Sequence, residues 1–512
     1  MVKSKSGIND LVVFQKLLVH EVTVEPKRVK ATYTVIHKDG SSVSNQLIYT
    51  YNSIYFDKTR ARDVNMASMM LAQVALNYGL FCQEIVFDGL YDEVDQRFLK
   101  EMMENTSREI LVLKFYSKNE FLKPPFDNLE HEKRPAYTAA KLTFRNTAYP
   151  ALAIEKANLS PSENEYVILS SGGKDSLLTY GIIKELGVAH PVFINEAGRH
   201  WFTAVNAHQY YQEIEPNTVK PWCNSDRIFN WMVKQMPFIK ENFQQIRADI
   251  YPIRLWTVAV FLFGTLPVAM KREAGNILIG NEYDTTVKGN YKGITHYHGL
   301  YDQSKYFDNA LTRYYLKKGW NFKQYSILRS LSELLILKVL VKRYPKLQQQ
   351  QVSCHAAHED NGRMLPCGAC EKCRRIIGML MALDEDPKRC GYTEHQIKMG
   401  LDALEKKGVK QLGSDAAHLY YLLLSKGHLK ATEHSKKLAR EYPEIVSLRF
   451  DLERSNSEDL PLYIREPLYK ILAKYSEGSV VQRKGKWYTF TPDKDYLKQP
   501  YFLRKKDEYK TT

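Results

Sequence analysis

Short apolar runs alternate with longer stretches of helical spacing in the middle of the chain. The runs lie at Tyr166–Leu169, Pro191–Asn195 and Asn276–Gly280, and each is bounded by glycine or polar residues. Between the first two, Lys174–Leu186 has the spacing of a helix and ends at Gly187. Short buried strands that alternate with helices predict a parallel sheet, and therefore an α/β fold for this region.

The first 157 residues follow another pattern. Apolar and polar residues alternate in Lys30–His37 and Gln46–Tyr51, on either side of a polar turn, which predicts a β-hairpin. Helices are expected over Met66–Leu80 and Glu93–Met103. A polar, turn-forming stretch begins at about residue 158. We therefore expect an N-terminal α+β domain over residues 1–157, followed by the α/β region at 158–382.

The chain beyond residue 383 has mainly helical periodicity. Helices are expected over Glu394–Lys406, Ala416–Ser425 and Ala431–Glu441. A hairpin is expected from Ser479–Arg483 and Lys486–Thr491. These patterns predict a third, helix-rich domain over residues 383–512.

Composition is compatible with this three-domain plan. The chain has 512 residues, too many for one ordinary hydrophobic core, and its 44% apolar and 26% charged residues are typical of a globular protein. No run reaches the roughly 18 apolar residues of a membrane span. The nearest, Leu255–Met270, contains Gly264 and Pro267 and is interpreted as a buried helix. No membrane partner is expected, and the polar N-terminus favours a cytoplasmic location.

The chain carries a formal net charge of +15. A solvated basic surface explains this charge, and so does an anionic partner such as a nucleotide, a nucleic acid or an acidic protein. Lysine and arginine are spread along the sequence rather than collected in one motif. Charge alone therefore leaves nucleic-acid binding open.

A glycine-rich hexapeptide follows the first apolar run of the α/β region. Its glycines permit close approach of the backbone to phosphate, and the free N–H groups at the start of the next helix point toward such an anion. The two serine hydroxyls can donate hydrogen bonds to the same oxygens, whereas the aspartate suits Mg²⁺ ligation or bracing of the loop. A turn that merely caps a helix is the alternative. The candidate phosphate-binding residues are Ser171, Gly172, Gly173, Lys174, Asp175 and Ser176.

Seven cysteines are present, and four of them fall within twenty residues. Their spacing is Cys354-x12-Cys367-x2-Cys370-x2-Cys373, which predicts a metal site rather than a disulfide framework. Four thiolates complete the coordination shell of a structural Zn²⁺, and an iron–sulfur cluster is the competing interpretation. The other three cysteines lie outside this spacing and are expected to be plain thiols.

The hexapeptide resembles the SGGxDS signature of the PP-loop ATP pyrophosphatases. This resemblance implies cleavage of ATP between its α and β phosphates, transfer of AMP to a substrate oxygen, and displacement of AMP by a nucleophile. It also implies that Ser171, Gly172, Gly173, Asp175 and Ser176 hold the pyrophosphate portion of ATP, with Mg²⁺ nearby. Catalytic roles are expected for Ser171, Lys174, Asp175 and Ser176.

The region from about 165 to 382 further resembles the 7-cyano-7-deazaguanine synthase family of queuosine biosynthesis. Similar elements occur in the same order after the second and third strands and at the cysteine-rich end. They are Ala197–His200, Gly280–Asp284, Asp302–Phe307, Arg329–Glu333 at its glutamate, Ser353-Cys354 and Cys367–Arg374. This resemblance implies a deazaguanine-type substrate, with Asn281, Asp284, Asp302 and Lys305 as substrate-binding residues. Lys174, Arg199 and Lys305 are expected to stabilise the charge of the pyrophosphate or carboxylate, with Arg199 in the ATP site. A solvated surface position is the alternative for Lys305.

The chain departs from that family in two respects. Gln303-Ser304 replaces the family's Cys-Arg pair, and Thr285–Leu300 is a longer insertion before it. The flanking domains are additional as well. Enlarged proteins of this kind are associated with antiviral defence operons, where a deazaguanine is thought to be attached to a partner protein.

The hypothesis from sequence is ATP-dependent activation of a carboxylate, with 7-carboxy-7-deazaguanine as the expected substrate. Attack by ammonia gives an amide and then a nitrile, whereas attack by a protein amine gives a conjugate. ATP, Mg²⁺ and Zn²⁺ are the expected cofactors. The alternatives are a tRNA-modifying or thiolation enzyme and a nucleotide-binding interaction module without catalysis.

Overall fold

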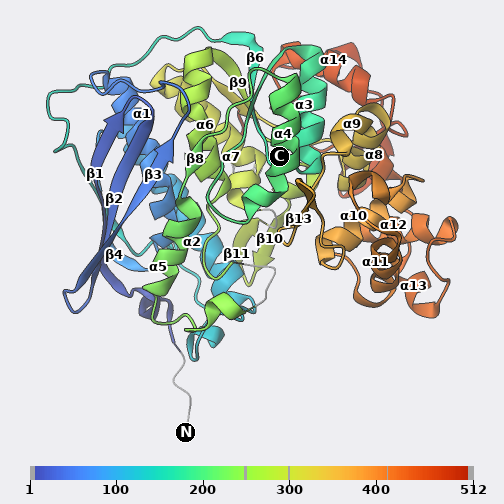
Figure 1. Cartoon of the computed structure of the whole chain (residues 1–512), viewed down its shortest axis with the longest axis horizontal. Coiled ribbons are helices and arrows are strands. Elements are labelled where there is room, and N and C mark those ends of the chain that lie inside the picture. The colour runs from blue at the N-terminus through green and yellow to red at the C-terminus, as the bar shows by residue number, and fades with distance from the viewer. Residues whose placement is uncertain (1–5, 247–250, 298–299, 412, 506–512) are drawn as a thin grey trace.

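The computed structural model describes residues 6–246, 251–297, 300–411 and 413–505. From one end to the other, the molecule consists of an N-terminal mixed sheet with its helices, a central parallel sheet between helices, and a C-terminal group of helices (Figure 1). It is a mixed α/β protein, as the sequence predicts for its central region.

A six-stranded sheet forms the N-terminal part, in the order β5-β4-β1-β2-β3-β8. The predicted hairpin is confirmed, because β2 pairs antiparallel with β3 from Arg28–Thr50 to Ile36–Ser42. The last strand, β8, lies later in the sequence than the first two strands of the parallel sheet. It joins the N-terminal sheet by pairing with β3, where Tyr49 is opposite Cys223. The strands and helices are β1 (Phe14–Glu25), β2 (Arg28–His37), β3 (Ser42–Thr50), β4 (Cys82–Asp88), β5 (Lys141–Arg145), β8 (Trp222–Cys223), α1 (Ala61–Ala72) and α2 (Glu93–Ile110).

A four-stranded parallel sheet occupies the centre, in the order β12-β9-β6-β7. Its second strand begins at Val188, earlier than expected, and the third begins at Ala274. The helix predicted over Lys174–Leu186, between the first two strands, is confirmed with the same bounds. The elements are β6 (Ser162–Leu169), β7 (Val188–Val192), β9 (Ala274–Leu278), β12 (Lys323–Tyr325), α3 (Lys174–Leu186), α4 (His200–Ile214), α5 (Ser225–Lys234), α6 (Val258–Arg272), α7 (Lys305–Lys318), α8 (Glu333–Arg343) and α9 (Pro345–Gln348).

Both faces of the parallel sheet are buried, each in its own hydrophobic core. Along β6, Val167 belongs to the core shared with the N-terminal sheet, whereas Tyr166 and Ile168 belong to the core shared with the C-terminal helices. The second half of β6 is covered on both faces, which explains why Tyr166–Leu169 is a continuous apolar run rather than an alternating one. Each core takes residues from more than one of the three predicted segments.

The C-terminal part is rich in helices, as expected, and carries a small sheet. The predicted helix near Ala431 is confined to Glu433–Leu438. The predicted hairpin is present, with a third strand parallel to it. The elements are α10 (Glu371–Ala382), α11 (Glu394–Lys407), α12 (Gly413–Ser425), α13 (Glu433–Leu438), α14 (Leu462–Leu472), α15 (Lys494–Leu497), β15 (Leu448–Phe450), β16 (Ser479–Arg483) and β17 (Lys486–Thr489). Two small hairpins, β10–β11 (Lys288–Tyr291, Ile294–Tyr297) and β13–β14 (His358–Asp360, Arg363–Leu365), complete the fold.

Candidate functional site

The glycine-rich hexapeptide is the turn between the carboxyl end of β6 and the start of α3. Ser171 N donates to Ser176 Oγ at 3.2 Å, and Ser176 Oγ donates to Gly173 O at 3.1 Å. These bonds close the turn on itself, leaving Ser171 exposed and Ser176 buried. Ligands of open parallel sheets bind at this edge, outside the carboxyl ends of the strands.

Gly172 is required by the packing of this turn. Its φ is +75°, and a β-carbon there would come 2.1 Å from the carbonyl oxygen of Thr203 on α4. The Thr203 hydroxyl also donates to Ser171 O at 3.0 Å. The second helix of the sheet therefore fixes the turn from one side, while the N–H groups of the first turn of α3 have no acceptor within that helix.

Lys174 is buried among three carboxylates. Its Nζ lies 2.8 Å from Asp175 Oδ1, 3.3 Å from Glu282 Oε2 and 3.3 Å from Glu333 Oε1. Burial alone would lower the pKa of Lys174, but attraction to these carboxylates raises it overall. The charged form of Lys174 is thus favoured, and its partners are acidic side chains of the chain itself.

Glu282 and Glu333 were not selected from the sequence as site residues. Glu333 is the first residue of α8. Its carboxylate lies 3.4 Å from Arg375 Nη1 and accepts a hydrogen bond from Gln411 Nε2 at 2.6 Å. Lys174 and Arg375 together lower the pKa of Glu333 although burial opposes this. A signal was available, since Glu333 is the position at which Arg329–Glu333 resembles the synthase family.

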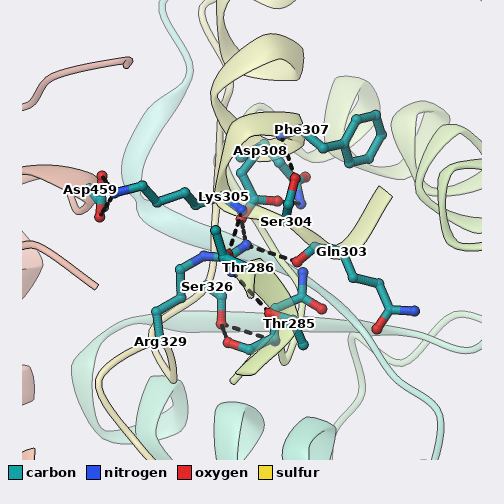
Figure 2. Close-up of polar contacts among 12 residues, drawn as sticks. Thr285, Thr286, Gln303, Ser304, Lys305, Phe307, Asp308, Ser326, Arg329 and Asp459 are labelled. Atoms are coloured by element: carbon teal, nitrogen blue, oxygen red, sulfur yellow. Dashed lines mark hydrogen bonds and ion pairs between the residues drawn. The ribbon is translucent and has the colours of Figure 1, made fainter. Parts of the chain in front are cut away.

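Arg329, the first residue of one stretch that carries the resemblance, contacts segments that follow or contain two others, as Figure 2 shows. The guanidinium donates to the hydroxyls of Thr285 and Thr286 at 3.2 and 3.0 Å, and to Gln303 O at 3.2 Å. It also forms an ion pair with Asp308 at the start of α7. One buried arginine therefore joins the loop after β9, the turn before α7 and the loop after β12.

The loop after β9 is also tied directly to the loop after β12. Ser326 Oγ accepts from Asn281 N at 3.0 Å and donates to Asn281 O at 2.7 Å. Asn281 is buried, whereas Asp284 is partly buried. Burial raises the pKa of Asp284 to about 6, repulsion from Glu333 and Asp415 adds to the shift, and Lys174 and Arg449 oppose it.

Asp302 and Lys305, expected to bind substrate, have structural partners. The Asp302 carboxylate accepts from three backbone N–H groups at the start of α6, at 2.9 to 3.3 Å. Lys305 Nζ lies 2.9 Å from Asp459 and donates to Leu452 O at 2.8 Å, which joins α7 to the C-terminal part (Figure 2). Arg199, expected at the ATP, is exposed at the residue before α4.

The four clustered cysteines converge on one point. Their Sγ atoms all lie within 4.8 Å of one another, and Cys373 Sγ is 3.8 Å from Cys367 Sγ and 3.5 Å from Cys370 Sγ. Zn–S bonds of about 2.3 Å in a tetrahedron place sulfurs about 3.8 Å apart, so the arrangement fits a zinc ion. Cys354 and Cys373 are buried, and Cys82, Cys223 and Cys390 are buried outside the group.

The cysteine cluster lies against the glycine-rich turn. Val352 N, two residues before the first cysteine, donates to Gly172 O at 3.3 Å. The ring of His355 contacts that of His200 of α4 in a tilted arrangement, with 4.3 Å between centroids, and His355 Nε2 lies 3.3 Å from Lys372 Nζ. His355 is therefore half-buried in these contacts, whereas His358 is exposed.

Comparisons with known proteins add no assignment. No protein-family profile matches the chain, and no curated protein matches it in sequence. Within the described ranges, no helix is both long enough and apolar enough to cross a membrane.

Proposed function

We propose that this protein is an ATP-dependent ligase of the PP-loop pyrophosphatase type, which activates a carboxylate by adenylation. The observation that carries the proposal is the Ser171–Ser176 turn at the carboxyl edge of a parallel sheet, with the loops after β9 and β12 joined beside it. The resemblance to 7-cyano-7-deazaguanine synthases supports 7-carboxy-7-deazaguanine as the carboxylate.

The proposed reaction has two steps. A carboxylate oxygen attacks the α-phosphorus of ATP, the bond between the α and β phosphates breaks, and pyrophosphate leaves. An amine nitrogen then attacks the acyl carbon, AMP leaves, and the nitrogen loses a proton to give an amide. A second activation of that amide leads to the nitrile, whereas a protein amine as acceptor gives a conjugate.

Residues of the turn would act mainly by orientation and charge. The exposed Ser171 hydroxyl and the N–H groups at the start of α3 would hold the pyrophosphate oxygens. Asp175 and Glu282 would hold Mg²⁺, which offsets phosphate charge when bound. Four carboxylates, those of Asp175, Glu282, Asp284 and Glu333, lie near the cations Lys174, Arg375 and Arg449, and such a group of carboxylates suits a divalent cation.

A structural zinc ion in the Cys354–Cys373 cluster would support this site. Val352, two residues before the first cysteine of the cluster, forms a backbone hydrogen bond with Gly172. Helix α10 begins after Cys370 and contains Arg375, which forms an ion pair with Glu333. Closed coordination by four thiolates leaves no sulfur free for transfer, which favours the ligase over a thiolation enzyme.

Product analysis tests the proposal. Purified protein is incubated with Mg-ATP, with and without 7-carboxy-7-deazaguanine, and nucleotides, small molecules and intact protein are followed by mass spectrometry. We expect AMP and pyrophosphate whose release depends on the carboxylate and is lost in Asp175→Asn. Formation of ADP and phosphate, or no stimulation by the carboxylate, would overturn the assignment. A mass gain on a protein would identify the conjugating form of the reaction.

A further inference from the structure

The C-terminal part of the chain reaches the loop after β9 through one buried arginine. Arg449 lies on β15, and its backbone N–H donates to Ser330 O at 2.9 Å in the loop after β12. Its guanidinium carbon lies 3.9 Å from the centre of the Tyr283 ring, and its Nη1 lies 3.5 Å from Asp415 Oδ2. Arg449 is 2% exposed.

One edge of this guanidinium is unused within the described structure. Arg449 Nε and Nη2 are buried and have no hydrogen-bond partner. These two N–H groups are parallel donors of the kind that binds a pair of acceptors. A buried donor without a partner costs about 1–3 kcal/mol, so an unused pair calls for an explanation.

Other segments also carry buried acceptors and donors without hydrogen-bond partners. Asp284, the residue after Tyr283, has a buried Oδ1 without a hydrogen-bond partner, and Asn281 on the same loop has an unpaired Nδ2. Gln411 Oε1 is unpaired as well, although Gln411 contacts Glu333. The charge of Arg449 acts on Asp284, since it opposes the rise of that carboxyl's pKa. Arg449 and the loop after β9 meet at the Tyr283 ring, and both carry buried polar atoms without hydrogen-bond partners.

The geometry points to a recognition site in which Arg449 and Asp284 together bind the lactam edge of a guanine-type base. This inference rests on the proposed function and names how its substrate is selected. A guanine-type ring presents a carbonyl oxygen beside two N–H donors. Arg449 would donate to the carbonyl, and Asp284 would accept from the ring N–H groups. An adenine-type edge, with an amino donor in place of the carbonyl, would oppose Arg449 with a donor.

The site also gives the C-terminal part a function in substrate selection. Arg449 follows Glu282-Tyr283-Asp284 by more than 160 residues in sequence and is held there by the Tyr283 ring and Asp415. Tyr283 itself donates to Asp451 Oδ2 at 2.9 Å, so both sides of this junction are anchored. The base would therefore be bound between the loop after β9 and β15, two segments that are far apart in the sequence.

Equilibrium binding of 7-carboxy-7-deazaguanine and 7-deazaadenine, measured by calorimetry without ATP, tests the inference. We expect the wild type to prefer the guanine-type ligand, and Arg449→Met to lose about ten- to hundredfold of that affinity, as for hydrogen bonds to a charged group. Asp284→Asn should lose a similar factor. Arg454→Met is the matched control, because Arg454 also lies over Tyr283, at 5.1 Å, but is not among the unpaired groups.

The outcomes separate this inference from the proposed function. If Arg449→Met binds the guanine-type ligand as tightly as the wild type and Arg454→Met do, the recognition site is overturned. The proposed ligase function is not affected by that result. Equal loss in Arg449→Met and Arg454→Met would overturn the recognition site too, because it would assign Arg449 to packing alone. A wild type that binds neither base would contradict the deazaguanine substrate itself. Circular dichroism of each variant establishes that it is folded.

Discussion

Gly280 and Asp175 are in such close contact that a β-carbon at position 280 would come 2.7 Å from the β-carbon of Asp175. Gly280 ends the run that forms β9, and Asp175 lies in the first turn of α3. The glycine therefore lets the loop after β9 approach the glycine-rich turn, which brings Glu282 to Lys174.

Gly280→Ala is expected to disturb both stability and nucleotide binding. Forcing a methyl group into this contact displaces backbone and costs about 1–3 kcal/mol. Chemical denaturation and titration with a fluorescent ATP analogue measure the two effects. Gly7→Ala is the control, because a β-carbon at Gly7 meets no atom within 4 Å. Unchanged nucleotide affinity in Gly280→Ala would show that the contact does not shape the binding turn.

The cysteine cluster predicts one zinc ion per chain. Elemental analysis of purified protein should find zinc at that ratio, and Cys367→Ala should lose it, while Cys390→Ala, buried outside the cluster, should retain it. Because Val352 is bonded to Gly172, metal loss should also weaken ATP binding. Iron with strong visible absorption would assign the cluster to iron–sulfur chemistry, and full metal retention in Cys367→Ala would contradict the ligand set.

Lys305 is expected to act in stability. Its side chain is 1% exposed and its ammonium is paired with Asp459, so Lys305→Met leaves a buried carboxylate without its counter-charge and should cost about 3–5 kcal/mol of unfolding free energy. Lys305→Met with Asp459→Leu should recover much of that loss. Lys323→Met, which removes a more exposed pair with Glu163, should cost about 1 kcal/mol or less. If Lys305→Met leaves stability unchanged and raises only the KM for the carboxylate, its assignment returns to substrate binding.

Asp302 predicts a pH dependence of stability. Burial raises its pKa from 3.8 to about 7 although three backbone N–H groups favour the charged form. As the pH rises, Asp302 therefore ionises in the unfolded chain before it does in the folded one. The stability that comes from its neutral form is complete below about pH 4, is lost as pH rises, and is absent above about pH 7. Asp302→Asn keeps an acceptor for the N–H groups and should remove this slope from the melting temperature measured between pH 5 and 8. Exposed Asp402→Asn should retain it, and an unaltered slope in Asp302→Asn would contradict the prediction.

Local pattern predicted the parts of the site that are local in sequence. Helix α3 has the expected bounds because its apolar spacing and its glycine end signal are adjacent in the chain, and the cysteine group follows from its own spacing. The pairing of β3 with β8 was not predicted, because two residues of strand carry too little pattern. The carboxylates around Lys174 also come from distant segments. Their assembly depends on strand order, which one sequence does not specify.

The transfer of a labelled oxygen tests the central claim most directly. The carboxyl group of 7-carboxy-7-deazaguanine is enriched with ¹⁸O, the purified protein is supplied with Mg-ATP and ammonia, and the AMP formed is examined by mass spectrometry. Adenylation of the carboxylate predicts that AMP carries one ¹⁸O atom, because a carboxyl oxygen leaves with phosphorus. AMP without label would show that water, and not the carboxylate, attacks ATP, and this result would contradict the ligase assignment.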